Sequence, residues 1–189
     1  MSGIYSGLQS SIKHHVKEAD YVLCASHSLT LVGISVAECC VEGISYFGFI
    51  QSVYVFLSVS TYQWDTLTNC YQQKQLTAKC LSSTRWSACA DATRAVRAGY
   101  QEIKEALMKL SQDESQKPIA RNDAEALSKR FDVLETTLMT VIWDTLLQRF
   151  NSKSKSLQNP KINLGVSADL YKSLYEFVQI TREHFNQIE

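Results

Sequence analysis

The chain has 189 residues, of which 45% are hydrophobic and 20% are charged. This length fits one ordinary domain, and the composition is that of a folded globular protein rather than a disordered one. Lysine plus arginine equals aspartate plus glutamate at 19 each, which argues against a stand-alone DNA-binding module or a membrane-surface protein. Only two prolines and seven glycines occur, which is few for an all-β sandwich.

The first third of the chain predicts a short helix, one strand and two further helices. Apolar residues recur every four positions over residues 4–16, which is typical of a helix with one apolar face. Residues 21–25 form a β-branched and aromatic run that predicts a buried strand. Two helices are expected between residues 28 and 60, with a break near residues 39–43.

The run from Leu29 to Val59 is apolar enough to be considered as a membrane span. Glu38 and Glu42 interrupt it, and the uninterrupted remainder is shorter than the ~20 apolar residues that a transmembrane helix needs. We therefore expect two buried helices and no membrane partner.

The middle of the chain predicts an irregular segment followed by a helix. Residues 71–83 are polar and are expected to be irregular. The next helix should begin at Ser83 or Thr84, either of which can cap it with a hydroxyl. An apolar stripe carries this helix to residue 110.

The last part of the chain predicts two amphipathic helices. Residues 111–118 end in a proline and form the clearest linker. One long helix is expected over residues 124–150, where apolar residues step by three and four. Asn159-Pro160 and Gly165 mark the next break, and a final helix is expected over residues 170–185.

The six cysteines are expected to be free thiols. The first residues, Met1 to Tyr5, lack the basic stretch followed by an apolar run that marks a secretory signal. Without secretion, thiols stay reduced. We therefore expect an intracellular chain, nuclear or cytoplasmic.

Two short sequence motifs flank the apolar stretch. The first runs from Cys24 to His27 as Cys-Ala-Ser-His, and the second is Arg85-Trp86. In this order they resemble the Cys-x-x-His and Arg-Trp motifs of hAT-superfamily DNA transposases. The resemblance is closest to the transposase-derived proteins grouped with the zinc-finger MYM-type proteins and the repressor of the inhibitor of the protein kinase. Relatives often have alanine at the position of Ser26 and usually have asparagine at that of Thr30.

The resemblance implies a fold and a domain division. In this family an RNase H-like α/β nuclease is interrupted by a large all-helical insertion. Residues 1–27 would then be a remnant of the RNase H-like core, consisting of a helix and one strand. Residues 28–189 would be the all-helical insertion domain. The expected fold class is mainly α, with this single remnant strand.

The resemblance also implies that the chain lacks the catalytic centre. Enzymes of this kind hold two metal ions with three carboxylates. By resemblance, two of the three lie before the position of Met1 and the third lies beyond Glu189. Asp20, Asp65 and Asp91 do not occupy matching positions. We expect no catalytic residue and no cofactor, with Mg²⁺ relevant only if the missing segments are restored.

Each of the two motifs has a functional and a structural interpretation. Cys24 and His27 have the inner spacing of a zinc ligand pair, but no second pair follows at finger spacing, so we expect no metal site. A histidine in such a place is more often a hydrogen-bonded core group. Trp86 beside Arg85 suits stacking on an unpaired base while the cation holds a phosphate. In active relatives the matching tryptophan is implicated in stabilising a flipped base. The alternative that Trp86 packs at a helix start stays open, because large aromatics are mostly buried.

Two main functional hypotheses follow. In the first, the chain is a catalytically inactive piece of a transposase-derived protein that acts as an interaction or regulatory module. Its partners would be DNA, bound weakly, and a protein partner or a second copy of the chain. In the second, it is an incomplete piece of an active DNA-cleaving hAT transposase. An unrelated helical adaptor would require both motifs to be coincidental. Lys153, Lys155 and Lys161 form a modest basic patch, which we expect to be solvated surface.

Overall fold

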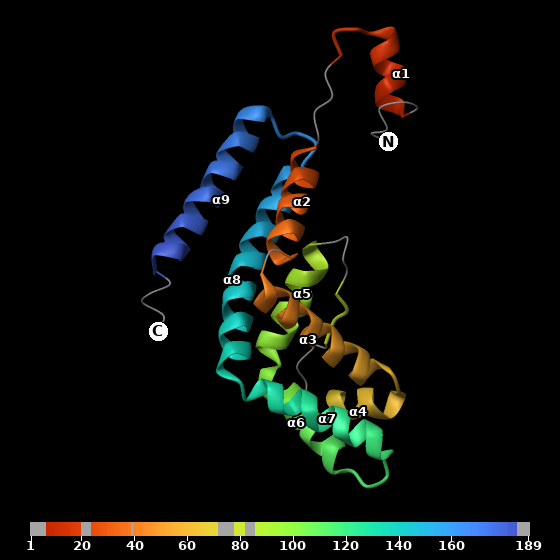
Figure 1. Ribbon diagram of the computed structural model, residues 1–189. Helices are drawn as coiled ribbons and strands as arrows, with labels where there is room; N and C mark the ends of the chain where they lie inside the picture. The colour runs from red at the N-terminus through yellow and green to blue at the C-terminus, as the bar shows by residue number, and fades with distance from the viewer. Residues whose placement is uncertain (1–6, 20–23, 39, 72–77, 82–85, 185–189) are drawn as a thin grey trace.

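The protein is built from α-helices. The computed structural model describes residues 7–19, 24–38, 40–71, 78–81 and 86–184 (Figure 1). Its helices are α1 (Leu8–His15), α2 (Ala25–Glu38), α3 (Val41–Ser58), α4 (Thr61–Cys70), α5 (Trp86–Ala98), α6 (Tyr100–Gln112), α7 (Pro118–Phe131), α8 (Leu134–Leu157) and α9 (Leu164–His184). The mainly α fold predicted from apolar spacing is confirmed.

The strand predicted over residues 21–25 is wrong where it can be compared with the structure. Residues 21–23 lie outside the described residues, but Cys24 has no regular structure and Ala25 already belongs to α2. The backbone N–H of Ser28 donates to the Cys24 carbonyl at 2.9 Å, which closes the first helical turn. A strand needs a neighbouring strand for its backbone hydrogen bonds, and the described part of the chain contains none.

Two of the predicted helices are each divided into two. The helix expected to reach residue 110 consists of α5 and α6, which meet at Gly99. The Tyr71 ring lies against Gly99, in the space that a side chain would fill. The helix expected over residues 124–150 consists of α7 and α8, which are separated by Asp132 and Val133.

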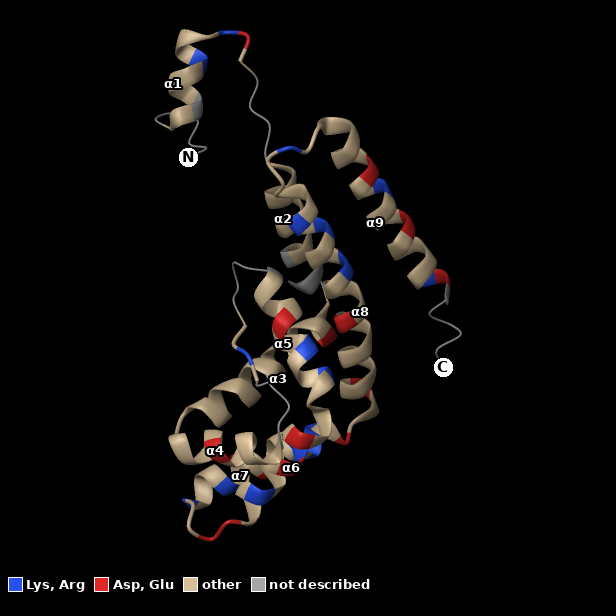
Figure 2. Ribbon diagram, turned by 180° about the vertical axis from the view of Figure 1, so that it is seen from behind, with Lys and Arg blue, Asp and Glu red and all other residues tan. Residues whose placement is uncertain are grey.

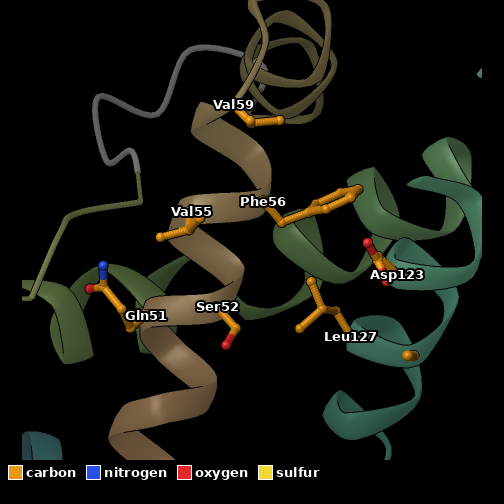
Figure 3. A pocket seen from close by; sticks show the side chains of 8 residues that line it. Gln51, Ser52, Val55, Phe56, Val59, Asp123 and Leu127 are labelled. Carbon is orange, nitrogen blue, oxygen red and sulfur yellow. The ribbon is translucent and has the colours of Figure 1, made fainter. Parts of the chain in front are cut away.

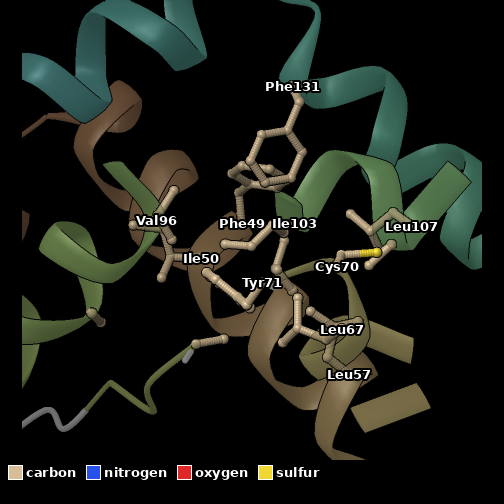
Figure 4. Packing of buried hydrophobic residues seen from close by; sticks show 14 of the residues in the cluster. Phe49, Ile50, Leu57, Leu67, Cys70, Tyr71, Val96, Ile103, Leu107 and Phe131 are labelled. Atoms are coloured by element: carbon tan, nitrogen blue, oxygen red, sulfur yellow. The ribbon is translucent and has the colours of Figure 1, made fainter. Parts of the chain in front are cut away.

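The larger hydrophobic core lies among α3, α4, α5, α6, α7 and α8. Figure 4 shows its centre, where Phe49 and Ile50 of α3 face residues of α4, α6 and α7. The Phe49 ring packs edge-on against Phe131, with the ring centroids 5.0 Å apart. Burying one such large apolar side chain contributes roughly 1.5–3 kcal/mol. Trp143 is also buried here, as expected, and packs against Phe47.

A smaller second core joins α2, the end of α8, and α9. Its buried residues are Leu29, Leu157 and Leu174, one from each of these helices. Since α8 contributes to both cores, this long helix connects the two parts of the molecule. Figure 1 shows α9 running beside α8, while α1 lies apart from the other helices.

None of the helices within the described ranges is by itself long and apolar enough to cross a membrane. The pair α3 and α4 has the length and composition together, but the two helices are bent by 109° relative to each other.

Candidate functional site

The Cys-x-x-His motif lies at the start of α2. Cys24 precedes the helix and His27 lies in its first turn, and both side chains are exposed. The structure therefore does not place His27 as a hydrogen-bonded core residue. Ser26, which lies between them in the motif, is buried, with 5% of its surface exposed.

Ser26 links the start of α2 to the end of α8. Its Oγ lies 3.0 Å from the Ser154 Oγ, and Gln158 Nε2 donates to it at 3.1 Å. Nearby, the Tyr171 hydroxyl of α9 donates to the Ala25 carbonyl at 2.6 Å. These bonds hold the exposed Cys24 and His27 beside the carboxyl end of α8. Sequence reasoning missed this role of Ser26, because its partners Ser154 and Gln158 are 128 and 132 residues away in the chain.

The Arg-Trp motif lies at the start of α5. Arg85 is outside the described residues, and Trp86 is the first residue of α5, with its side chain also outside them. The backbone of α5 runs antiparallel to α8. Arg97 Nη1 donates to Asp144 Oδ2 at 2.7 Å, and about two turns earlier in α5 the Ala90 carbonyl accepts from Gln148 Nε2 at 3.0 Å.

This antiparallel packing of α5 on α8 brings the two motifs to the same part of the molecule. Continuing it by one turn places the backbone of Trp86 beside the turn of α8 that begins near Asn151. Ser26 contacts α8 at Ser154, one turn further along. Because a helix rises about 1.5 Å per residue, the starts of α5 and α2 reach α8 within roughly 10 Å of each other along its axis. Sequence order alone gives no sign of this proximity.

The same part of α8 carries an unbalanced positive charge. Residues 145–168 contain Arg149, Lys153, Lys155 and Lys161 and no aspartate or glutamate. Figure 2 shows Lys and Arg segments in blue along the carboxyl half of α8 and at the turn before α9, and no Asp or Glu segment in red there. Arg149 is engaged within the fold, because it donates to Ser173 and lies over the Phe177 ring.

The three lysines of this region differ from those at the opposite end of the molecule. Lys153, Lys155 and Lys161 form no ion pair with any described residue. On α6 and α7, by contrast, lysines are paired with carboxylates. These pairs are Lys104–Asp132, Lys109–Glu105 and Lys129–Glu125. The balanced net charge of the whole chain therefore conceals one end with unpaired cations. We call this end, formed by residues 145–168 and the starts of α2 and α5, the basic end.

The acidic residues are scattered over the fold. Asp65 lies on α4, Asp91 on α5 pairs with Lys79 at 3.7 Å, and Asp20 is outside the described residues. Within the described ranges, no three His, Cys, Asp or Glu side chains are close enough to hold a metal ion together. Cys24, Cys40, Cys70 and Cys80 are present as thiols.

Comparisons of the chain with models of protein families, with curated proteins and with solved structures find no match.

Proposed function

We propose that this chain is a non-catalytic helical module of hAT-transposase type that binds nucleic acid weakly at the basic end. The observation that carries the proposal is the stretch of residues 145–168, which has four cations and no acid and lies beside the starts of α2 and α5. The resemblance of Cys24, His27, Arg85 and Trp86 to the family motifs adds a direction, namely DNA as the nucleic acid.

The charge pattern supports weak binding to the phosphate backbone. Each lysine that neutralises a phosphate releases condensed counterions, so the logarithm of the binding constant falls with the logarithm of salt concentration by about 0.9 per contact on duplex DNA. Three unpaired lysines then give about three contacts. That number suits a module that assists binding within a larger assembly.

Arg85 and Trp86 would add a preference for unpaired bases. Stacking of a base on an aromatic side chain is worth ~1–3 kcal/mol and depends little on base identity. Since α5 begins beside the cationic turn of α8, a nucleic-acid strand whose phosphates contact Lys153 and Lys155 would have its bases within reach of the Arg-Trp motif.

The test is a fluorescence anisotropy titration of the full chain with a duplex oligonucleotide and with a hairpin that carries unpaired bases. In the test variant Lys153, Lys155 and Lys161 are replaced by glutamate. In the control, Lys109, Lys117 and Lys129 of the opposite end are replaced in the same way, which gives the same net charge. Because Lys109 and Lys129 form ion pairs, circular dichroism is used to check that both variants stay folded. We expect the test variant to lose binding and about two to three units of salt dependence, and the control to keep both. Equal losses in the two variants would show that only net charge matters and would refute the site.

The same titration with Trp86→Ala separates stacking from packing. A stacking residue should cost ~1–3 kcal/mol on the hairpin and little on the plain duplex. Equal weakening on both substrates, or a loss of helical circular dichroism, would show that Trp86 is a packing residue instead.

A further inference from the structure

An open apolar groove lies between α3 and α7. It has a volume of about 540 Å³ and is lined by Gln51, Ser52, Val55, Phe56, Val59, Asp123, Ala126 and Leu127. Figure 3 shows Phe56 on the α3 side and Asp123 and Leu127 on the α7 side. Val55 and Val59 are 51% and 73% exposed, so the groove presents aliphatic surface to solvent.

The helix α1 has an apolar face that no described helix covers. Leu8 and Ile12 are one helical turn apart and lie on one face of α1, and Val16 follows at its C-terminal cap; these three side chains are 61%, 48% and 50% exposed. This spacing is the pattern with which an amphipathic helix fills a hydrophobic groove on a partner. An isolated helix of this length is not stable in water, so α1 gains from being docked.

The charges of α1 and of the groove are complementary. The helix α1 (Leu8–His15) contains Lys13, His14 and His15 and no acid, and Lys17 and Glu18 follow it. The one charged residue that lines the groove is Asp123, which forms no ion pair with a described residue. A cationic helix in the groove would give this carboxylate a partner.

The α1 helix is poorly placed to reach the groove of its own chain. When Val16 is docked, residues 17–24 remain as the connection to α2, and eight residues span at most about 28 Å. The groove begins at Gln51, which the chain reaches after about 21 Å along α2 and then about 15 Å along α3, and the sum of these lengths is an upper limit on the separation. Figure 1 shows α1 near the start of α2, whereas the facing parts of α3 and α7 lie toward the other end of the molecule.

We propose that two copies of the chain pair by exchanging α1, so that α1 of each copy lies in the α3–α7 groove of the other. The exchange is reciprocal and closes with twofold symmetry, which is the commonest symmetry of soluble oligomers. One short helix in a groove buries little surface, but the reciprocal arrangement forms the contact twice.

The test is the oligomeric state of the full chain, measured by sedimentation velocity over a concentration series. We expect a dimer for the unchanged chain. Ile12→Asp places a carboxylate on the apolar face of α1, and Val55→Asp places one in the groove. Both side chains are exposed in the single chain, so both variants should fold. Each should raise the dimer dissociation constant at least tenfold. Met108→Asp, at an exposed apolar residue of α6 outside the groove, should leave it unchanged.

Mixing the two variants gives the decisive measurement. Ile12→Asp keeps an intact groove and Val55→Asp keeps an intact α1, so a mixture regains one of the two contacts. We expect heterodimers in the mixture that neither variant forms alone. A monomeric unchanged chain, a dimer that survives either substitution, or a mixture that stays monomeric would each overturn the proposal.

Discussion

At the scale of single residues, Gly99 shows how one tertiary contact sets a helix boundary. A Cβ atom placed on Gly99 would overlap the hydroxyl and ring of Tyr71. Tyr71 itself is buried, with 2% of its surface exposed, and burial raises the pKa of its hydroxyl to about 12. The ring therefore has little room to move away.

Gly99→Ala is accordingly expected to destabilise the protein by about 1–3 kcal/mol, the usual cost of overpacking a core. The measurement is the free energy of unfolding in urea. Gly48→Ala is the matched control, because a Cβ on this exposed residue within α3 meets nothing within 4 Å. Alanine is the better helix former, so Gly48→Ala should raise stability by up to about 1 kcal/mol. If the two variants unfold alike, Tyr71 does not set the boundary.

At the scale of elements, the sequence predicts the helical faces better than the helix ends. Spacing by three and four finds the apolar faces of α7 and α8, but it continues across Asp132 and Val133, where neither proline nor glycine marks the turn. The linker predicted over residues 111–118 is found at residues 113–117, and its end is predicted well because proline at the first helical position is a strong local signal. Breaks that depend on distant contacts, as at Gly99, leave no such local mark.

The candidate site divides in the same way. The two motifs, with Cys24 and His27 in one and Arg85 and Trp86 in the other, and the basic patch can be found in the sequence by inspection. Their proximity cannot, since it depends on how α2 and α5 pack against α8. The strand predicted before His27 fails for a related reason. A short apolar run fits a strand or a buried helix start equally well, and the tertiary partner decides between them.

The start of α4 offers a test of local helix signals. Ser60 Oγ accepts from the Gln63 backbone N–H at 3.2 Å, and Gln63 Oε1 accepts from the Ser60 hydroxyl at 2.9 Å. Ser60→Ala removes both bonds and should cost about 1 kcal/mol of unfolding free energy. Ser156→Ala, at a serine within α8, removes no cap and should cost less than about 0.5 kcal/mol. A Ser60 variant as stable as the Ser156 variant would show that packing alone fixes the bend between α3 and α4.

At the scale of the whole molecule, the two cores separate two kinds of surface. The larger core supports the α3–α7 groove, and the smaller core holds the start of α2, with Cys24 and His27, against the cationic end of α8. Because α8 takes part in both, a partner bound at one end acts on a helix that also packs at the other. The groove on α3 and the carboxyl end of α8 lie at opposite ends of the molecule, so Val55→Asp tests the proposed self-association without altering the proposed nucleic-acid surface.

The last prediction is that this chain alone does not cleave DNA. Two-metal phosphoryl transfer needs carboxylates that converge on ions about 3.5–4 Å apart, because only their charge holds the metals where the attacking and leaving oxygens become negative. Asp65 and Asp91 lie on different helices, and Asp91 already pairs with Lys79. The measurement is incubation of the purified chain with Mg²⁺ or Mn²⁺ and a labelled oligonucleotide that carries a hAT-type terminal repeat, followed by a denaturing gel. We expect no nicking above that of a mock purification. Metal-dependent nicking that co-purifies with the chain and disappears on replacing a single aspartate by asparagine would contradict the prediction. That result would mean that carboxylates of this chain form a metal centre of their own.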